Sequence, residues 1–156
     1  MSKIKFIVVG NTRSSFLKQG EAFYLERLRR YAATEWIEVR PQKVSKGWSR
    51  EEILRVEGLS IEKKYLPDDH IIALDLKGKE YDSEGLAGLV QNLLQTPKRL
   101  CFVVGGPLGL SKKVLDTAFD IISLSRMTLT HEMSRLILLE QIYRAHTIIK
   151  GEKYHK

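Results

Sequence analysis

The chain has 156 residues, 43% of them hydrophobic and 29% charged, which indicates one soluble globular domain over residues 1–156 and excludes disordered and fibrous classes of protein. Its apolar runs fall well short of the roughly 20 residues that span a bilayer, and charge and asparagine follow Met1 too closely for a secretory signal, so we expect a cytoplasmic protein without a membrane partner. With 26 Lys and Arg against 19 Asp and Glu, the formal net charge of +7 at pH 7 modestly favours a polyanionic partner such as nucleic acid.

The first half of the chain alternates between strand and helix patterns. "KIKFIVVG" (residues 3–10) has the continuous hydrophobicity of a buried strand, and residues 16–31 repeat their apolar side chains at helical spacing. "WIEV" (residues 36–39) predicts a short second strand. Ser49, followed three residues later by Glu52, matches a capping box that opens a helix, which Pro67 ends.

The second half continues the alternation. "HIIALDL" (residues 70–76) predicts a strand, "KGK" (77–79) a turn, and Ser83 the cap of a leucine-rich helix. "LCFVV" (100–104) is the next strand, and its Cys101 is expected to be a core residue rather than a nucleophile. Ser111 then caps a short helix to about residue 118, "DIISLS" (120–125) forms a fifth strand, and a long helix covers residues 131–150, with Gly151 at its end.

Strands that are apolar throughout, each followed by a helix, are typical of an α/β fold whose parallel sheet is covered on both faces. In such sheets, ligands bind at the carboxyl ends of the strands. Three segments are therefore expected at one rim: "DLKGK" (75–79), "GGPLG" (105–109) and "SRMTLTHEM" (125–133).

The glycines of "GGPLG" have two interpretations. Gly105 and Gly106 could expose backbone groups to a small molecule, because glycine permits close approach; alternatively, the tight connection needs glycine for its own geometry. The segment lacks the Lys-Ser/Thr of a P-loop and does not match G-x-G-x-x-G, so it does not predict a phosphate cradle.

Basic residues gather in "RPQKVSKGWSR" (40–50) and in the terminal "KGEKYHK" (150–156). Lys43, Lys46 and Trp48 form either a solvated loop or an RNA contact in which cations meet phosphates and the indole stacks on a base.

Taken together, "LDLKGK", "VVGGPLGL", "SLSRMTLTHEMSRLILLEQIYRA" and the terminal "YHK" resemble the ribosomal RNA large subunit methyltransferase H family of the SPOUT superfamily. The resemblance spans essentially the whole chain. It implies a homodimeric α/β methyltransferase with a C-terminal trefoil knot, which uses S-adenosyl-L-methionine and no metal to methylate N3 of a pseudouridine in 23S rRNA, free or in the ribosome. The knot follows from the resemblance alone, because chain connections rarely thread loops.

The resemblance also implies functional residues in or directly before each of the three rim segments. The cofactor pocket maps onto Leu74, Gly105 with its neighbour Gly106, and the segment Leu124, Ser125, Arg126, Met127, Thr128 and Leu129. The resemblance further implies that the C-terminal tail lies over a cofactor pocket, which we expect to be that of the partner subunit, and that Lys153 and Lys156 contact RNA there. The alternative is a frayed chain end.

Candidates for orienting the base and accepting its proton are His131, Arg144, Tyr154 and His155. His155 is the preferred one, because an imidazole in a surface tail has few structural roles. His131 is equally well explained as the cap of the last helix. Thr130 stands where the family pattern leads us to expect proline.

Two further alternatives stay open. The last helix is apolar over more than one stripe, which fits either a sheet on one side and a dimer partner on the other, or a helix buried within the monomer. A non-catalytic protein that binds the ribosome would share the charge and the fold, and binding of a methyl donor separates the two functions.

Overall fold

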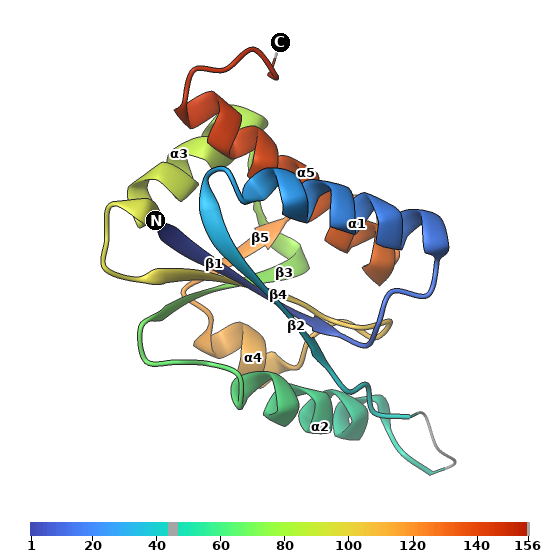
Figure 1. The fold of residues 1–156 in the computed structure, drawn as a ribbon. Helices are drawn as coiled ribbons and strands as arrows, with labels where there is room; N and C mark the ends of the chain where they lie inside the picture. The colour runs from blue at the N-terminus through green and yellow to red at the C-terminus, as the bar shows by residue number, and fades with distance from the viewer. Residues whose placement is uncertain (44–46, 156) are drawn as a thin grey trace.

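The computed structural model describes residues 1–43 and 47–155. The elements alternate along the chain as β1 (Ser2–Val9), α1 (Ser15–Leu28), β2 (Ala32–Val39), α2 (Arg50–Glu62), β3 (Asp69–Glu80), α3 (Ser83–Leu94), β4 (Arg99–Val104), α4 (Lys112–Thr117), β5 (Asp120–Ser123) and α5 (His131–Ile149). The five strands form one parallel sheet in the order β2-β1-β4-β3-β5 (Figure 1). The expected α/β class is confirmed.

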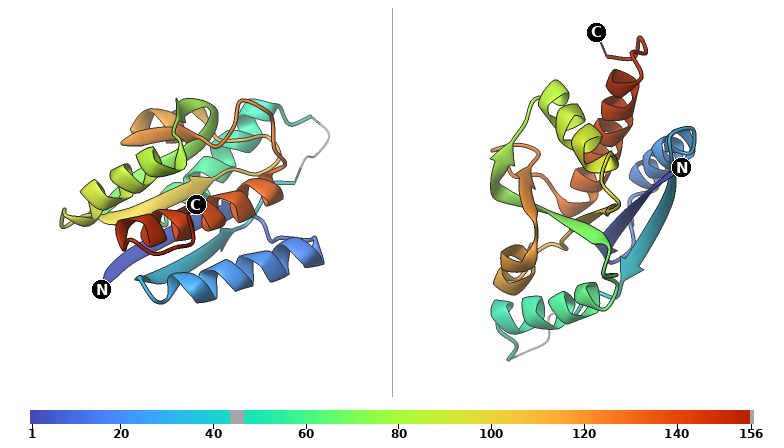
Figure 2. Two further views of the ribbon diagram at one scale, coloured as in Figure 1. Left: turned by 90° about the horizontal axis from the view of Figure 1, so that it is seen from above. Right: turned by 90° about the vertical axis from the view of Figure 1, so that its left-hand side faces the viewer.

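Helices cover both faces of the sheet, α1, α3 and α5 on one and α2 and α4 on the other (Figures 1 and 2). Alternate residues of each strand serve the two layers: Phe6 and Phe102 pack beneath α1, α3 and α5, whereas Ile7 and Val103 face α2 and α4. Cys101 belongs to the second layer, and complete burial raises the pKa of its thiol to about 12. It is a core residue, as expected.

Three local predictions were wrong in detail. "KGK" is not a turn, because β3 continues to Glu80 with a shift of register against β5 between Leu74 and Lys79. The cap of α3 is Asp82, whose carboxylate accepts a hydrogen bond from the backbone N–H of Gly85, and not Ser83. The fifth strand ends at Ser123, which leaves the following residues free to form a loop.

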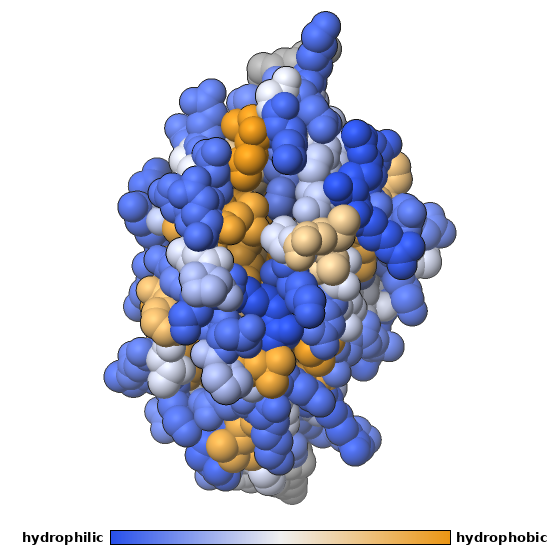
Figure 3. All heavy atoms as spheres, turned by 60° about the vertical axis from the view of Figure 1, so that its left-hand side comes forward, coloured by the Kyte–Doolittle hydropathy of each residue, from blue (hydrophilic) through white to orange (hydrophobic). Residues whose placement is uncertain are grey.

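Much of the apolar surface of α5 is covered within the chain. Leu138, Leu139 and Ile142 are buried in the core. The half-buried Leu136 packs so closely on α1 that a Cβ at Gly20 would lie 2.8 Å from its Cδ1. The face that carries α3 is mostly hydrophilic, with hydrophobic side chains in a few separate places (Figure 3). A dimer partner on α5 stays a prediction.

Candidate functional site

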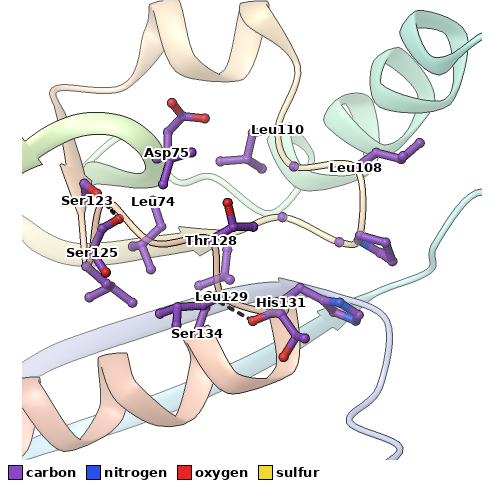
Figure 4. Close-up of a pocket in the computed structure, with 18 of the residues that line it drawn as sticks. Leu74, Asp75, Leu108, Leu110, Ser123, Ser125, Thr128, Leu129, His131 and Ser134 are labelled. Atoms are coloured by element: carbon purple, nitrogen blue, oxygen red, sulfur yellow. Dashed lines mark hydrogen bonds between the residues drawn. The ribbon is translucent and has the colours of Figure 1, made fainter.

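A cavity of about 600 Å³ lies where the three rim segments meet, at the carboxyl ends of β4 and β5 and beside β3 just past Ala73, its last residue paired with β4 (Figure 4). Its wall includes Leu74, Gly105, Gly106, Leu124, Ser125, Met127, Thr128 and Leu129. Eight of the nine residues expected to hold the cofactor thus line one cavity, and their binding of it stays a prediction. Arg126 is the exception, because its exposed side chain points to Glu80, at 3.8 Å, and does not line the cavity.

The glycine loop after β4 folds back on itself. A Cβ on Gly105 would lie 2.4 Å from the carbonyl oxygen of Gly109, and Gly109 has a φ of +84°, which favours glycine. The N–H of Gly109 donates to the carbonyl oxygen of Gly106 at 3.0 Å. Of the two interpretations, the geometry of the loop itself therefore accounts for Gly105, and the loop still presents its backbone to the cavity.

The loop after β5 forms the opposite wall. The hydroxyl of Ser123 donates to the carbonyl oxygen of Ser125 at 2.9 Å, and the hydroxyl of Ser125 accepts from the N–H of Met127 at 3.0 Å. These bonds hold a tight turn that directs Leu124 and Leu129 to the cavity, while Met127 at its edge is 76% exposed. Leucine walls with backbone groups between them suit a flat heterocycle, and the volume is typical of small-molecule sites.

Three titratable side chains line the cavity: Arg50, Asp75 and His131. Burial, and secondarily the charge of Arg135, lowers the pKa of His131, so that its imidazole is neutral near pH 7 and able to accept a proton. The guanidinium of Arg50 donates to the carbonyl oxygen of Leu108 at 2.9 Å. Arg50 was not predicted at the cavity, whereas Asp75 belongs to the rim segment "DLKGK" but was not named as a site residue.

His131 does not cap α5, contrary to one of its two interpretations. The cap is Thr130, whose hydroxyl accepts from the N–H of Met133 at 3.2 Å. His131 is the first helical residue and is half-buried at the cavity wall. Threonine therefore has a structural role at the position where we expected proline.

A buried arginine fixes this end of α5. Arg135 is 0% exposed and donates to the carbonyl oxygen of Val9 and, at 3.0 Å, to the hydroxyl of Thr12. Thr12 in turn donates to the carboxylate of Glu21, whose pKa burial raises. The network attaches the cavity end of α5 to β1 and α1, and sequence reasoning missed it because a charged residue in a helix is usually exposed.

The other three catalytic candidates form a cluster at the opposite end of α5. Glu140 accepts hydrogen bonds from Arg144 and, at 3.0 Å, from the hydroxyl of Tyr154. The guanidinium of Arg144 lies 4.7 Å from the ring centroid of Tyr154 and 3.4 Å from Nδ1 of His155. Tyr154 and His155 of the tail therefore lie against α5.

The cluster and the cavity are far apart within one chain. Arg144 follows His131 by thirteen residues on one continuous helix, which at 1.5 Å per residue corresponds to roughly 20 Å along the axis. His131 is thus the only one of the four candidates that meets the cavity of its own chain.

The proposed RNA contacts are exposed where the structure describes them. Lys43 and Lys153 are exposed, and Trp48 is 39% exposed. Lys46 and Lys156 lie outside the described residues. The basic stretch reaches the cavity through Arg50, the first residue of α2, so that Trp48 stands close in sequence to the cavity wall.

Within the described ranges, no helix is both long and apolar enough to cross a membrane. Nor do residues 1–43 and 47–155 bring together three or more His, Cys, Asp or Glu side chains that could hold a metal ion.

Comparisons with known proteins agree with this geometry. The family described as "Predicted SPOUT methyltransferase" matches residues 2–155. A protein of Halothermothrix orenii named "Ribosomal RNA large subunit methyltransferase H" is 45% identical over 158 residues, covering 99% of each chain. A protein of the same name from Bacillus pumilus is 43% identical over 157 residues, covering 98% of this chain and 99% of its own.

Solved structures show the same fold at low identity. A probable methyltransferase from Bordetella pertussis superposes with a TM-score of 0.59 at 15% identity, covering 92% of this chain and 94% of its own. A probable methylase family protein from Haemophilus influenzae superposes with a TM-score of 0.56 at 14% identity, covering 98% of this chain and 70% of its own. The sequence matches over nearly the full length show that the chain belongs to the SPOUT methyltransferase family, in its ribosomal RNA large subunit methyltransferase H branch.

Proposed function

We propose that the protein is a cytoplasmic enzyme that methylates N3 of a pseudouridine in 23S rRNA with S-adenosyl-L-methionine. The observation that carries this proposal is the cavity, where two loops with backbone groups and leucine side chains face each other next to a neutral histidine. Bound S-adenosyl-L-methionine would supply an activated methyl group. Leu74, Leu124 and Leu129 would enclose its adenine, and the backbone of residues 105–109 and 125–128 would pair with its polar edges.

The chain's own residues then have two tasks. They hold the base in line with the methyl group, since alignment alone can contribute about 7–11 kcal/mol to catalysis, and they take up the proton of N3. Two imidazoles are available, His131 at the cavity and His155 in the tail cluster. Arg144 would position the second of these, since its guanidinium lies 3.4 Å from Nδ1 of His155, and Glu140 holds both Arg144 and Tyr154.

We further propose that the active unit is a homodimer in which the tail cluster of one chain completes the cavity of the other. The support is the separation of cavity and cluster along α5, which a single chain cannot bridge while the tail stays on the helix. The exposed Lys43, Trp48 and Lys153 would contact RNA, as would Lys46 and Lys156. The trefoil knot remains a prediction.

Binding and transfer test the proposed activity. Thr128 is exposed at the cavity wall, so Thr128→Trp fills the cavity without disturbing the core, and Arg126→Trp, in the same loop but outside the cavity, is the matched control. Calorimetric titration with S-adenosyl-L-methionine should show binding by the wild type and the control only. Methyl transfer to 23S rRNA lacking the modification should follow the same pattern, and a wild type that binds no donor would overturn the proposal.

Mixing inactive chains tests the shared site. Thr128→Trp removes the cavity and Arg144→Ala removes the tail cluster, so each homodimer should be inactive. If the cluster acts on the partner's cavity, random mixing restores about a quarter of wild-type activity, because half of the dimers are mixed and each carries one intact site. If the cluster acts on its own chain's cavity, the mixture stays inactive.

A further inference from the structure

Arg50 is a charged cavity residue that the proposed methyl transfer has not yet used. It opens α2 and its side chain is exposed at the cavity mouth, where its guanidinium donates to the carbonyl oxygen of Leu108 at 2.9 Å. A guanidinium carries five N–H donors, and this bond uses one of them. Among the described residues, Arg50 has no acidic partner within 4.0 Å. Its charge is therefore available to a ligand.

The other charges of the cavity narrow the choice of ligand group. Asp75 lines the wall on β3, and Figure 4 shows it apart from Leu108, the residue that Arg50 contacts. Burial keeps the pKa of His131 low, so His131 adds no positive charge near neutral pH. Arg50 is thus the one cation at the described wall, and Asp75 is the one carboxylate.

A methyl donor of the proposed kind carries charges of both signs in its amino-acid portion. A carboxylate that enters a partly enclosed site needs a cationic or hydrogen-bonding partner, and a guanidinium can hold it through two parallel N–H bonds. Asp75, at another part of the cavity wall, would repel the donor's carboxylate and attract the donor's cationic groups. The geometry points to Arg50 as the residue that binds the donor's carboxylate and so sets which way round the donor lies. This inference rests on the proposed function.

The alternative source of an anion is a phosphate of the RNA, because Arg50 also ends the basic stretch. The carboxylate is favoured by position, since Arg50 lines the same cavity as the leucines that would enclose the adenine. Arg55 lies on the same helix, is exposed, and is not part of the cavity wall, which makes it a matched control for charge.

The test is a titration calorimetry experiment with two probes, S-adenosyl-L-methionine and its decarboxylated form, which differ only in the carboxylate. Because Arg50 is exposed, we expect the wild type to bind the decarboxylated probe about tenfold more weakly. Arg50→Ala should bind both probes alike, Arg50→Lys should keep part of the difference, and Arg55→Ala should keep all of it. Any shift of the loop at Leu108 changes both affinities together and leaves their ratio unaffected.

Three results would contradict the inference, and they are distinguishable. A wild type that binds both probes equally shows that the carboxylate has no partner in the cavity. An unchanged ratio in Arg50→Ala, with weaker binding of 23S rRNA fragments, assigns Arg50 to phosphate instead. A wild type that binds neither probe overturns the proposed function itself, and this inference with it.

Discussion

His146 makes stability depend on pH in a direction that can be calculated. The side chain is 3% exposed, stacks on Tyr31 with ring centroids 5.3 Å apart, and its Nε2 has no hydrogen-bond partner among the described residues. Burial, with a smaller contribution from Lys150, lowers its pKa from 6.5 to about 4. Between pH 6.5 and about 4, His146 is therefore protonated in the unfolded chain and neutral in the folded chain. The stability contributed by the neutral ring is therefore complete above pH 6.5 and is lost as the pH falls to about 4.

At 1.36 kcal/mol for each pKa unit, the whole effect is about 3 kcal/mol, of which about 2.5 kcal/mol is lost by pH 4.5. The comparison is between the wild type and His146→Phe, which keeps an aromatic ring against Tyr31 and cannot titrate. Urea unfolding at pH 7.5 and 4.5, at one fixed chain concentration, gives the free energy of unfolding for both. The wild type should lose about 2.5 kcal/mol more than the variant on acidification. Losses that agree within 0.5 kcal/mol would refute the reasoning.

Three further substitutions test other contacts. Arg135→Met leaves buried acceptors unpaired and should lower the free energy of unfolding by about 3–5 kcal/mol in urea titrations. The control Arg126→Met, at an exposed position, should change it by less than about 0.5 kcal/mol. Equal effects of the two substitutions would contradict the stabilising role of the Arg135 hydrogen bonds. Gly105→Ala places a Cβ against the carbonyl of Gly109, so it should lower the free energy of unfolding by about 1–3 kcal/mol and weaken donor binding. An unchanged thermal midpoint would contradict this prediction. Thr130→Ala removes a helix cap and should cost about 1 kcal/mol, which Thr130→Ser should restore.

The sheet could be predicted because its signals are local. A strand such as β4 is hydrophobic at every position, as a strand covered on both faces must be, and the helices begin at recognisable caps such as Ser49 and Ser111. The error at "KGK" has a tertiary cause. Gly78 lies where a Cβ would come within 2.6 Å of the backbone of β5, so that glycine serves a close approach between strands and not a turn.

The candidate site was predictable where it depends on topology. Parallel strands bring their carboxyl ends together, which placed the loops after β4 and β5 around one cavity, next to the part of β3 that extends past its pairing with β4. Arg50 and Arg135 escaped prediction, because whether a helical arginine is exposed, buried or at a cavity depends on packing. The position of Arg144, Tyr154 and His155 relative to the cavity was equally out of reach, since it follows from the length and direction of α5.

Because α5 is one continuous helix, it fixes the spacing between the cavity and the tail cluster of the same chain. His131 and Arg144 belong to the same unbroken helix. The number of residues between them therefore sets their distance along the helix axis and their relative direction around it. One inserted residue would rotate the tail by about 100° and advance it by 1.5 Å, whereas a whole number of turns would move it by 5.4 Å per turn with its facing nearly kept. If the tail acts at a cavity as proposed, insertions or deletions between these two residues have to preserve the direction in which the tail faces.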